Sequence, residues 1–401
     1  MQGRPDQFDW IIWGGYGWGN TGDEICLAAA LDRLQAKAPG GLAVLSHNPE
    51  YTSRLFPNVE VLPCLPAGRG FSKRCKNFAR HLSNAFASLR RHGTARGFTL
   101  PFQPDWAHHL SRARHLYLCG GGYLTDHLSM DVVLPPILQA ARMGMSIATA
   151  PIGIGPFKSG GNARRVARAL AHAEVKVRDE ASRAFCRSHG LHATLERDAA
   201  FAWARLVPPA TSVEFARPRP RKLGLCFFSQ YGEGTNYDFS GWWTKCLRGL
   251  RARHPDAEIE GFSFHASPEY EFREMARIFA GAGLSVHNVR PPEVDFRKAA
   301  AALRSYDFIV SARFHAIVLA NAFQIPNIAI AAGDYYLPKM RAAIGGYQSI
   351  SRLVNPAVQP PETLVASCNL TSPPAAMHLK RRSLPASRSA RPQPAGWSGR
   401  I

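Results

Sequence analysis

Runs of apolar residues alternate with helical patterns along most of the chain. In the first half, strand-like runs lie near residues 10–14, 42–46, 59–62, 115–119, 146–151, 174–177 and 193–196. After a proline-rich joint at 206–222 the alternation restarts, with runs at 223–229, 257–264, 284–289, 307–311 and 327–331. Alternating strands and helices predict mainly parallel sheets covered by helices on both faces. We therefore predict an α/β protein with two Rossmann-like domains, 1–205 and 223–370, a linker at 206–222 and a ligand cleft between the domains.

The chain is strongly basic. Its net charge is +20, from 49 Lys and Arg against 29 Asp and Glu. Such an excess attracts nucleic acid, anionic lipid, or phosphorylated and carboxylated small molecules. Part of it lies in a basic amphipathic pattern at 71–92, which predicts a helix that either lies on an anionic membrane or docks on its own core. Another part lies in a tail at 371–401 rich in Pro, Ser and Arg, which we predict to be disordered.

Targeting and cysteine signals place the chain in the cytoplasm. No apolar run reaches the roughly 18 residues that a membrane span needs, and the first residues do not resemble a signal peptide. The eight cysteines never form a C-x-x-C pair. This predicts reduced, partly buried thiols and neither disulfides nor a metal site. If the basic helix predicted at 71–92 lies on a membrane, the protein contacts the inner face of the cell membrane.

Four loops follow a predicted strand and open a helix, which is where parallel sheets carry their functional residues. They read "GGYGWGNTGDE" at 14–24, "CGGGYLTD" at 119–126, "VRDEAS" at 177–182 and "SARFHA" at 311–316.

The first loop has the G-x-G-x-x-G spacing of a dinucleotide site, in Gly17, Gly19 and Gly22. However, the next strand ends without the acidic residue that holds the ribose. Asp23 and Glu24 would also place carboxylates beside a pyrophosphate. We therefore expect no nicotinamide or flavin cofactor. The glycines allow close approach to a ligand, or else the loop is structural and its acids favour the helix N-terminus.

The other loops carry cations and glycines. Arg313 and His315 emerge together at the end of a strand, where they could bind an anion and move a proton. Alternatively, His315 has only a structural role. Arg178 is similarly placed, or is an ion-pair partner of Asp179. The three glycines before Asp126 form an anion-binding nest or a tight turn.

These loops, in this order, resemble the polysaccharide pyruvyl transferase family. The resemblance also includes "ERDAAF" at 196–201 and "SARFHAIVLANAFQIPNIAIAAGDYYLPKM" at 311–340, and spans about residues 10–345. It implies a GT-B-like fold. It also implies transfer of an enolpyruvyl unit from phosphoenolpyruvate to two hydroxyls of a sugar, in a cell-surface polysaccharide or its lipid-linked precursor.

On this resemblance, Arg178 and Arg313 would hold the carboxylate and phosphate of the donor. His315, as an imidazolium, would protonate the methylene carbon, and Asp23 or Asp126 would accept the hydroxyl proton. Substrate contacts are expected from Gly17, Gly19, Asn20, Gly121, Gly122, Asp126 and Lys339. No cofactor is expected beside the co-substrate phosphoenolpyruvate. Two alternatives stay open: a GT-B nucleotide-sugar glycosyltransferase and a non-catalytic polyanion-binding protein. Nucleic acid is not an expected partner.

Overall fold

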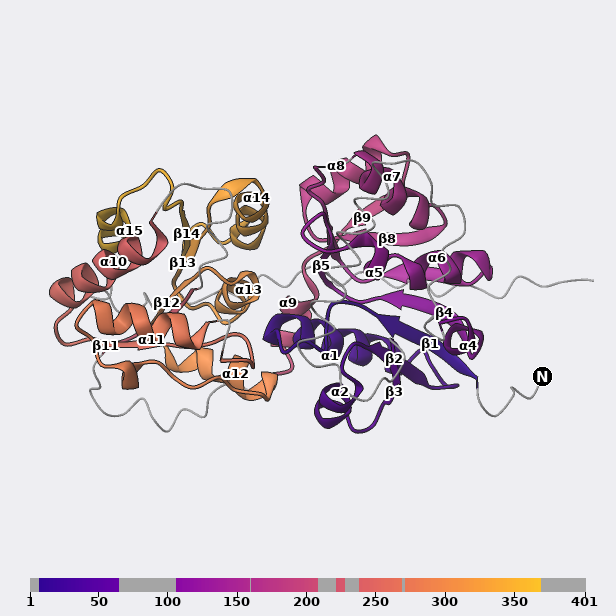
Figure 1. Ribbon diagram of the computed structural model, residues 1–401, viewed down its shortest axis with the longest axis horizontal. Helices are drawn as coiled ribbons and strands as arrows, with labels where there is room; N and C mark the ends of the chain where they lie inside the picture. Colours follow the sequence, from indigo (N-terminus) through magenta and orange to yellow (C-terminus); the bar gives the residue numbers. More distant parts are fainter. Residues whose placement is uncertain are drawn as a thin grey trace, which may run out of the picture. The chain divides into compact units, whose positions relative to one another are not determined.

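The computed structural model describes residues 7–64, 106–158, 160–207, 221–227, 238–268 and 271–368. These residues build two parallel sheets, which confirms the predicted α/β class (Figure 1). The described part of the chain up to Cys368 is one compact unit.

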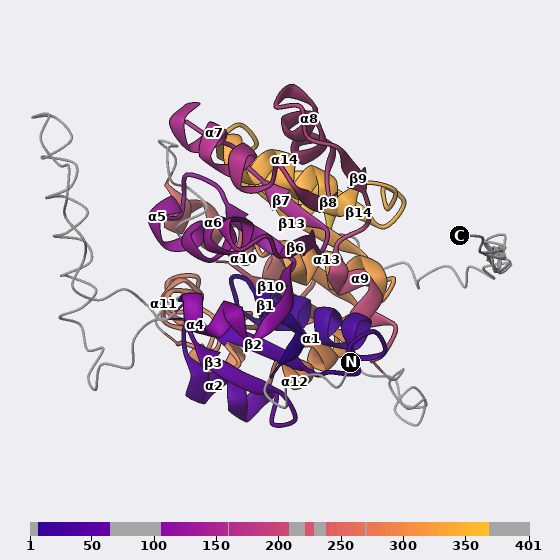
Figure 2. The same cartoon turned by 90° about the vertical axis from the view of Figure 1, so that its right-hand side faces the viewer.

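The first sheet has the strand order β3-β2-β1-β4-β6-β8-β7-β5, and β9 pairs with β8. Its strands are β1 (Phe8–Trp13), β2 (Leu42–Ser46), β3 (Glu60–Pro63), β4 (Ala113–Leu118), β5 (Gly121–Leu124), β6 (Ser146–Thr149), β7 (Ile152–Ile154), β8 (Ala173–Val177) and β9 (Ala193–Leu195). Its helices are α1 (Thr21–Gln35), α2 (Pro49–Leu55), α4 (Trp106–Ser111), α5 (Met130–Val133), α6 (Pro135–Arg142), α7 (Gly160–Ala169), α8 (Glu180–Ser188) and α9 (Ala199–Ala204). Figure 2 shows β1, β2 and β3 side by side, with α2 next to them.

The second sheet has the order β11-β10-β12-β13-β14. Its strands are β10 (Lys222–Cys226), β11 (Glu258–Gly261), β12 (Phe308–Ser311), β13 (Asn327–Ile330) and β14 (Ser351–Val354). Its helices are α10 (Phe239–Arg253), α11 (Phe272–Gly281), α12 (Phe296–Ala302), α13 (Phe314–Ala322), α14 (Gly333–Ile344) and α15 (Pro361–Ser367), with short 3-10 turns η3 (Val286–Asn288) and η4 (Leu303–Ser305). In both sheets the chain order reverses beside a central strand, β1 or β10, which is where such folds bind ligands.

The prediction of a strand at 284–289 is wrong. Residues Val286–Asn288 form η3, because the Ser285 hydroxyl accepts a hydrogen bond from the His287 N–H at 3.2 Å and turns the backbone. Val289 keeps a single bridge to Gly261. Strands β5, β7 and β14 were not predicted, since they are short and follow loops that contain glycine or proline.

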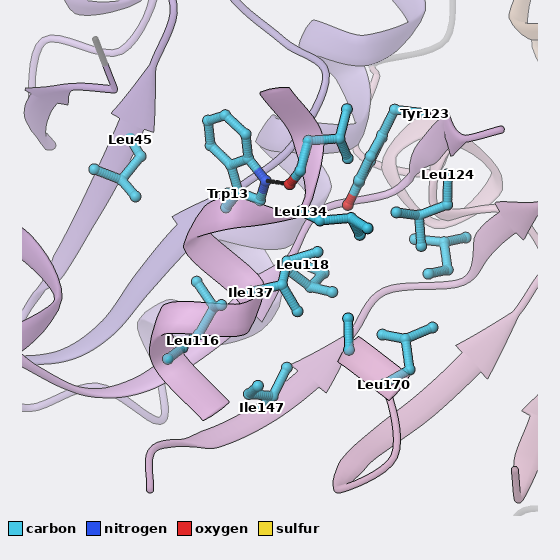
Figure 3. Packing of buried hydrophobic residues seen from close by; sticks show 14 of the residues in the cluster. Trp13, Leu45, Leu116, Leu118, Tyr123, Leu124, Leu134, Ile137, Ile147 and Leu170 are labelled. Carbon is cyan, nitrogen blue, oxygen red and sulfur yellow. Dashed lines mark hydrogen bonds between the residues drawn. The ribbon is translucent and has the colours of Figure 1, made fainter. Parts of the chain in front are cut away.

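Figure 3 shows part of the hydrophobic core of the first half, which includes Trp13. Trp13, the last residue of β1, is 1% exposed, and its indole N–H donates to the Val133 carbonyl oxygen at 3.2 Å. Apolar residues of neighbouring strands surround it, among them Leu45, Leu116 and Leu118. This packing fixes the end of β1 and with it the start of the loop.

Several sequence predictions fall outside the described residues: the 71–92 helix, the 371–401 tail and most of the 206–222 linker. Seven of the eight cysteines lie in the described residues, and all seven are free and buried. No helix in the described ranges is long and apolar enough to cross a membrane.

Candidate functional site

The loop after β1 is hydrogen-bonded to the loop after β11, so residues of the two sheets meet there. The Thr21 N–H donates to the Phe264 carbonyl at 3.1 Å, and the Ala266 N–H donates to the Gly19 carbonyl at 2.7 Å. Helix α1 begins at this junction, where the Asn20 side chain accepts from the Gly22 N–H. Helix α13, which carries His315, contacts both α1 and α9.

Gly22 is the third glycine of the G-x-G-x-x-G pattern, and its role is to make room for His315. A Cβ on Gly22 would lie 1.9 Å from the His315 Nδ1 atom. No side chain fits in that space. Gly22 therefore leaves space for the His315 imidazole, at the position where a dinucleotide-binding loop would hold the pyrophosphate.

Asp198, just before α9, connects Arg178 and His315. One carboxylate oxygen accepts from Arg178 Nη1 at 2.9 Å, and the other lies 3.8 Å from His315 Nε2. The side chains of Arg178 and Asp198 are each only 3% exposed. Asp179, the ion-pair partner considered from the sequence, is farther from Arg178, at 4.0 Å. The Arg178 guanidinium also stacks on the Phe314 ring at 4.2 Å.

Arg313 is held by Glu271, which caps α11. The Arg313 Nε donates to one Glu271 oxygen. The other oxygen accepts from the Ser263 hydroxyl at 2.9 Å and from the Phe264 N–H. Glu271 is fully buried. The guanidinium of Arg313 is thus fixed on its Nε side by a carboxylate that is itself immobile.

Lys339, on α14, joins this group of cations. Its Nζ atom lies 3.5 Å from the Tyr335 hydroxyl and 5.2 Å from the centre of the Phe314 ring. The Tyr335 hydroxyl donates to the Gly122 carbonyl at 3.3 Å. A Cβ on Gly122 would lie 2.9 Å from Arg178 Nη2 and 3.6 Å from Lys339 Nζ, so the glycine backbone of β5 lies close to both cations.

Asp23 points into the same region from the first turn of α1. It accepts from the Asn20 side chain at 2.7 Å, and a Cβ on Gly121 would lie 3.5 Å from its Oδ1 atom. Burial raises the pKa of Asp23 to about 6, although Lys339 and Arg178 act in the opposite direction. Burial likewise lowers the pKa of Lys339 to about 7. Both groups can therefore carry or lose a proton near neutral pH.

The protonation of His315 differs from the expectation. Burial lowers its pKa to about 3; nearby Asp198 opposes this shift, and the cations Arg178, Lys339 and Arg313 add to it. The imidazole is therefore neutral when no anion is bound. The expected imidazolium needs an anion that offsets the three cations.

Two adjacent cavities meet at this group. One, of about 720 Å³, is lined by Asp23, Arg313, His315 and Asn20. The other, of about 390 Å³, is lined by Arg178 and residues of α8. Gly122, Tyr335 and Lys339 line both cavities. Arg178 and Arg313 thus reach the same centre from two sides, with Lys339 where the cavities meet.

Three predicted site residues have mainly local roles. Asp126 accepts from the Lys158 N–H and from the Asn162 side chain at 2.7 Å, and it lines neither cavity. Gly17 donates its N–H to Glu24 at 2.8 Å. Gly19 pairs with the loop after β11, so it shapes the junction.

One group of described residues brings three possible metal ligands close together. Ligand atoms of Cys26, Asp198 and His315 lie within 4.8 Å of one another. The sequence could not show this group because its members are far apart in the chain. One Asp198 oxygen is already bound to Arg178. The cations that lower the His315 pKa would also repel a divalent ion, so we assign no metal here.

Asp198, Glu271 and Tyr335 were missed as site residues. Asp198 and Tyr335 lie in the stretches "ERDAAF" and "AAGDYYLP". The sequence therefore indicated the segments that contain them, but not the contacts of their side chains. Nothing local marks Glu271, because its partner Arg313 is 42 residues away.

Comparisons with known proteins concern the family and the fold. The family described as polysaccharide pyruvyl transferase matches residues 20–334. No curated protein sequence matches the chain.

Solved structures with a similar fold include three UDP-GlcNAc 2-epimerases. The one from Methanocaldococcus jannaschii has a TM-score of 0.53 at 10% identity, covering 89% of this chain and 90% of its own. A putative UDP-GlcNAc 2-epimerase from Listeria monocytogenes has a TM-score of 0.52 at 11% sequence identity, covering 89% of this chain and 85% of its own. The Neisseria meningitidis enzyme, bound to UDP-GlcNAc, has a TM-score of 0.51 at 12% sequence identity, covering 89% of each chain. At these identities the likeness concerns the fold alone, and it agrees with the predicted GT-B-like arrangement.

Proposed function

The chain belongs to the polysaccharide pyruvyl transferase family, and from that premise we propose that it moves the enolpyruvyl group of phosphoenolpyruvate onto two hydroxyls of a sugar. The products are a pyruvate ketal and phosphate. The acceptor is a sugar of a cell-surface polysaccharide or of its lipid-linked precursor, modified in the cytoplasm.

The convergence of three cations on one buried imidazole carries this proposal. Arg178, Arg313 and Lys339 all act on His315. Phosphoenolpyruvate has a carboxylate and a phosphate, and guanidinium groups bind both kinds of anion through paired hydrogen bonds. Lys339 lines both cavities, so a donor that spans their boundary meets all three cations.

Binding of the donor prepares His315 to act as an acid. The two anionic groups offset the cations that hold the His315 pKa low, and the imidazole takes up a proton. It then protonates the methylene carbon while the first sugar hydroxyl adds to the neighbouring carbon and gives its proton to Asp23. The adduct carries a methyl group, the carboxylate, the phosphate and the sugar oxygen on one carbon.

Departure of phosphate completes the reaction. The carbon–oxygen bond to phosphate breaks, and the proton on Asp23 passes to the leaving group. The second hydroxyl attacks the same carbon and gives its proton to the vacated carboxylate, from which the proton returns to solvent. The pKa of Asp23, near 6, suits a group that must accept and release protons in one cycle.

The test is phosphate release from phosphoenolpyruvate with a panel of lipid-linked and nucleotide-linked sugars. We expect Arg313→Ala and His315→Ala to lower kcat/KM by roughly 10²-fold or more, the usual scale for removing one stabilising or proton-transferring group. Val358→Ala, at an exposed site, is the control. Thermal stabilisation by UDP-sugars without any effect of phosphoenolpyruvate would refute the proposal in favour of a glycosyltransferase.

A further inference from the structure

Away from the reacting group, the wall of the larger cavity is rich in aromatic rings. Among the described residues that line it, the charged side chains are Asp23, Arg313 and Lys339, which all belong to the proposed reacting centre. The rest of the wall includes Trp18, His47, His127, Phe264, His265 and Tyr336. A volume of about 720 Å³ is large for a molecule as small as phosphoenolpyruvate. The cavity therefore has room for a second, uncharged ligand.

Trp18 lies at this wall against the His47 ring, with much of its own ring open. It is 57% exposed. Its neighbours Gly17 and Gly19 have φ angles of +87° and +83°, a backbone region that glycine adopts without strain. Added Cβ atoms would lie 2.7 Å from Ser46 Oγ and 3.1 Å from Ala266 Cβ, so the loop is fixed on both sides. The glycine pattern thus holds an indole out of the core.

The indole is the outer member of three rings in contact. The centre of the His47 ring lies 5.0 Å from that of Trp18 and 4.9 Å from that of the buried Trp13, with the ring planes tilted by 35° and 50°. Trp13 is part of the core of the first half. These contacts connect Trp18 to the core, and a supported side chain lowers the entropy cost of placing a ligand against it.

His47 offers a hydrogen-bond donor at the same place. The Cys64 sulfur lies 3.0 Å from His47 Nδ1, and burial raises the thiol pKa to about 12, so the sulfur keeps its proton. Burial also lowers the pKa of His47 to about 4, so the ring is neutral and has a proton on one nitrogen. In the tautomer in which the Cys64 S–H donates to Nδ1, that proton is on Nε2.

We propose that Trp18 and His47 form the acceptor subsite, which binds a neutral pyranose ring by packing the open indole face on its C–H groups and donating the His47 Nε2–H to a ring hydroxyl. This inference rests on the proposed function and names the part of the cavity that holds the sugar. Pyranose rings present C–H faces bordered by hydroxyls, so an aromatic face with a donor beside it matches them. Asn20 and Asp23 line the same cavity as Trp18 and His47, so a sugar bound there shares the cavity with the proposed proton acceptor.

The test separates acceptor binding from donor binding. Wild type, Trp18→Ala, Trp18→Phe, His47→Ala and His47→Gln are compared, with Val358→Ala as the control for loss of an exposed apolar group. We expect Trp18→Ala to raise the acceptor KM about tenfold or more, with the Kd for phosphoenolpyruvate within about twofold of wild type. Trp18→Phe and His47→Gln keep a ring or a donor and should recover part of the affinity. An unchanged acceptor KM in Trp18→Ala, or an equal loss of donor affinity, overturns the proposal.

A direct binding measurement keeps this inference distinct from the proposed function. Neutral methyl pyranosides are probed by saturation-transfer NMR without phosphoenolpyruvate. Binding to wild type that Trp18→Ala abolishes supports the subsite even if no enolpyruvyl transfer is found. Absence of binding of every methyl pyranoside to wild type, in a protein that turns over phosphoenolpyruvate, refutes the subsite and leaves the proposed function standing.

Discussion

Replacing Gly22 with alanine perturbs the proposed active site by one methyl group. The new Cβ would lie 1.9 Å from His315 Nδ1, whereas such atoms settle at roughly 3.5 Å. The imidazole and α1 must then separate by about 1.6 Å. A misplacement of about 1 Å in a reacting group can lower the rate roughly 10²-fold. Overpacking also costs about 1–3 kcal/mol of the free energy of unfolding.

A matched substitution isolates the clash from the general effect of alanine in a helix. Gly281, at the end of α11, has as its nearest neighbour Thr244 Oγ1, 3.9 Å from an added Cβ. Gly281→Ala should therefore keep wild-type stability or gain up to about 1 kcal/mol.

Urea unfolding and phosphate release from phosphoenolpyruvate are measured for both variants. Turnover and stability of Gly22→Ala equal to those of Gly281→Ala would refute the claim that this glycine exists to admit the imidazole.

Three further predictions concern buried charge. Asp198→Asn removes the nearer carboxylate from Arg178 and leaves only Asp179, at 4.0 Å, so urea unfolding should show a loss of about 3–5 kcal/mol; an unchanged midpoint would contradict the role given to this ion pair. Burial raises the pKa of Glu24 to about 8, so its contribution to stability should fall as pH rises from about 4.5 to 8, where only the unfolded state has lost the proton. Because other buried groups also titrate in this window, thermal melts compare the two proteins: the stability of wild type relative to Glu24→Gln should fall with pH, and an identical pH dependence in both would exclude the assignment. Phosphoenolpyruvate should bind with proton uptake above pH 7, because the bound anion favours charged Lys339, whose pKa is about 7 without it. Calorimetry in buffers of different ionisation enthalpy should show a smaller uptake in Lys339→Met, and proton release in wild type would contradict the proposal.

The pattern of apolar residues was enough to predict the class of fold. Strands such as β2 and β12 are apolar up to their last residue, because parallel strands are buried on both faces, and the strand ends locate the functional loops. The same reasoning failed at 284–289, where the side chain of Ser285 bends the backbone into a 3-10 turn. Local propensity does not report such a contact in advance.

Lys339 and Asp126 were both predicted as site residues, and only Lys339 lines a cavity. The resemblance placed it near the donor, and the structure brings its Nζ atom to the boundary of the two cavities. Asp126 came from an equally visible loop, yet it holds the Lys158 N–H and Asn162 and lines neither cavity. Position after a strand indicates a functional loop without telling which of its side chains faces the ligand.

The sequence by itself determined that two parallel sheets form and that arginine, histidine, aspartate and glycine gather at their carboxyl ends. These features depend on periodicity and spacing, which are local. Only the tertiary structure decided that Glu271 holds Arg313, that Asp198 joins Arg178 to His315, and that His315 is neutral when no anion is bound. Those properties depend on burial and on charges brought together from distant parts of the chain, and both exist only once the chain has folded.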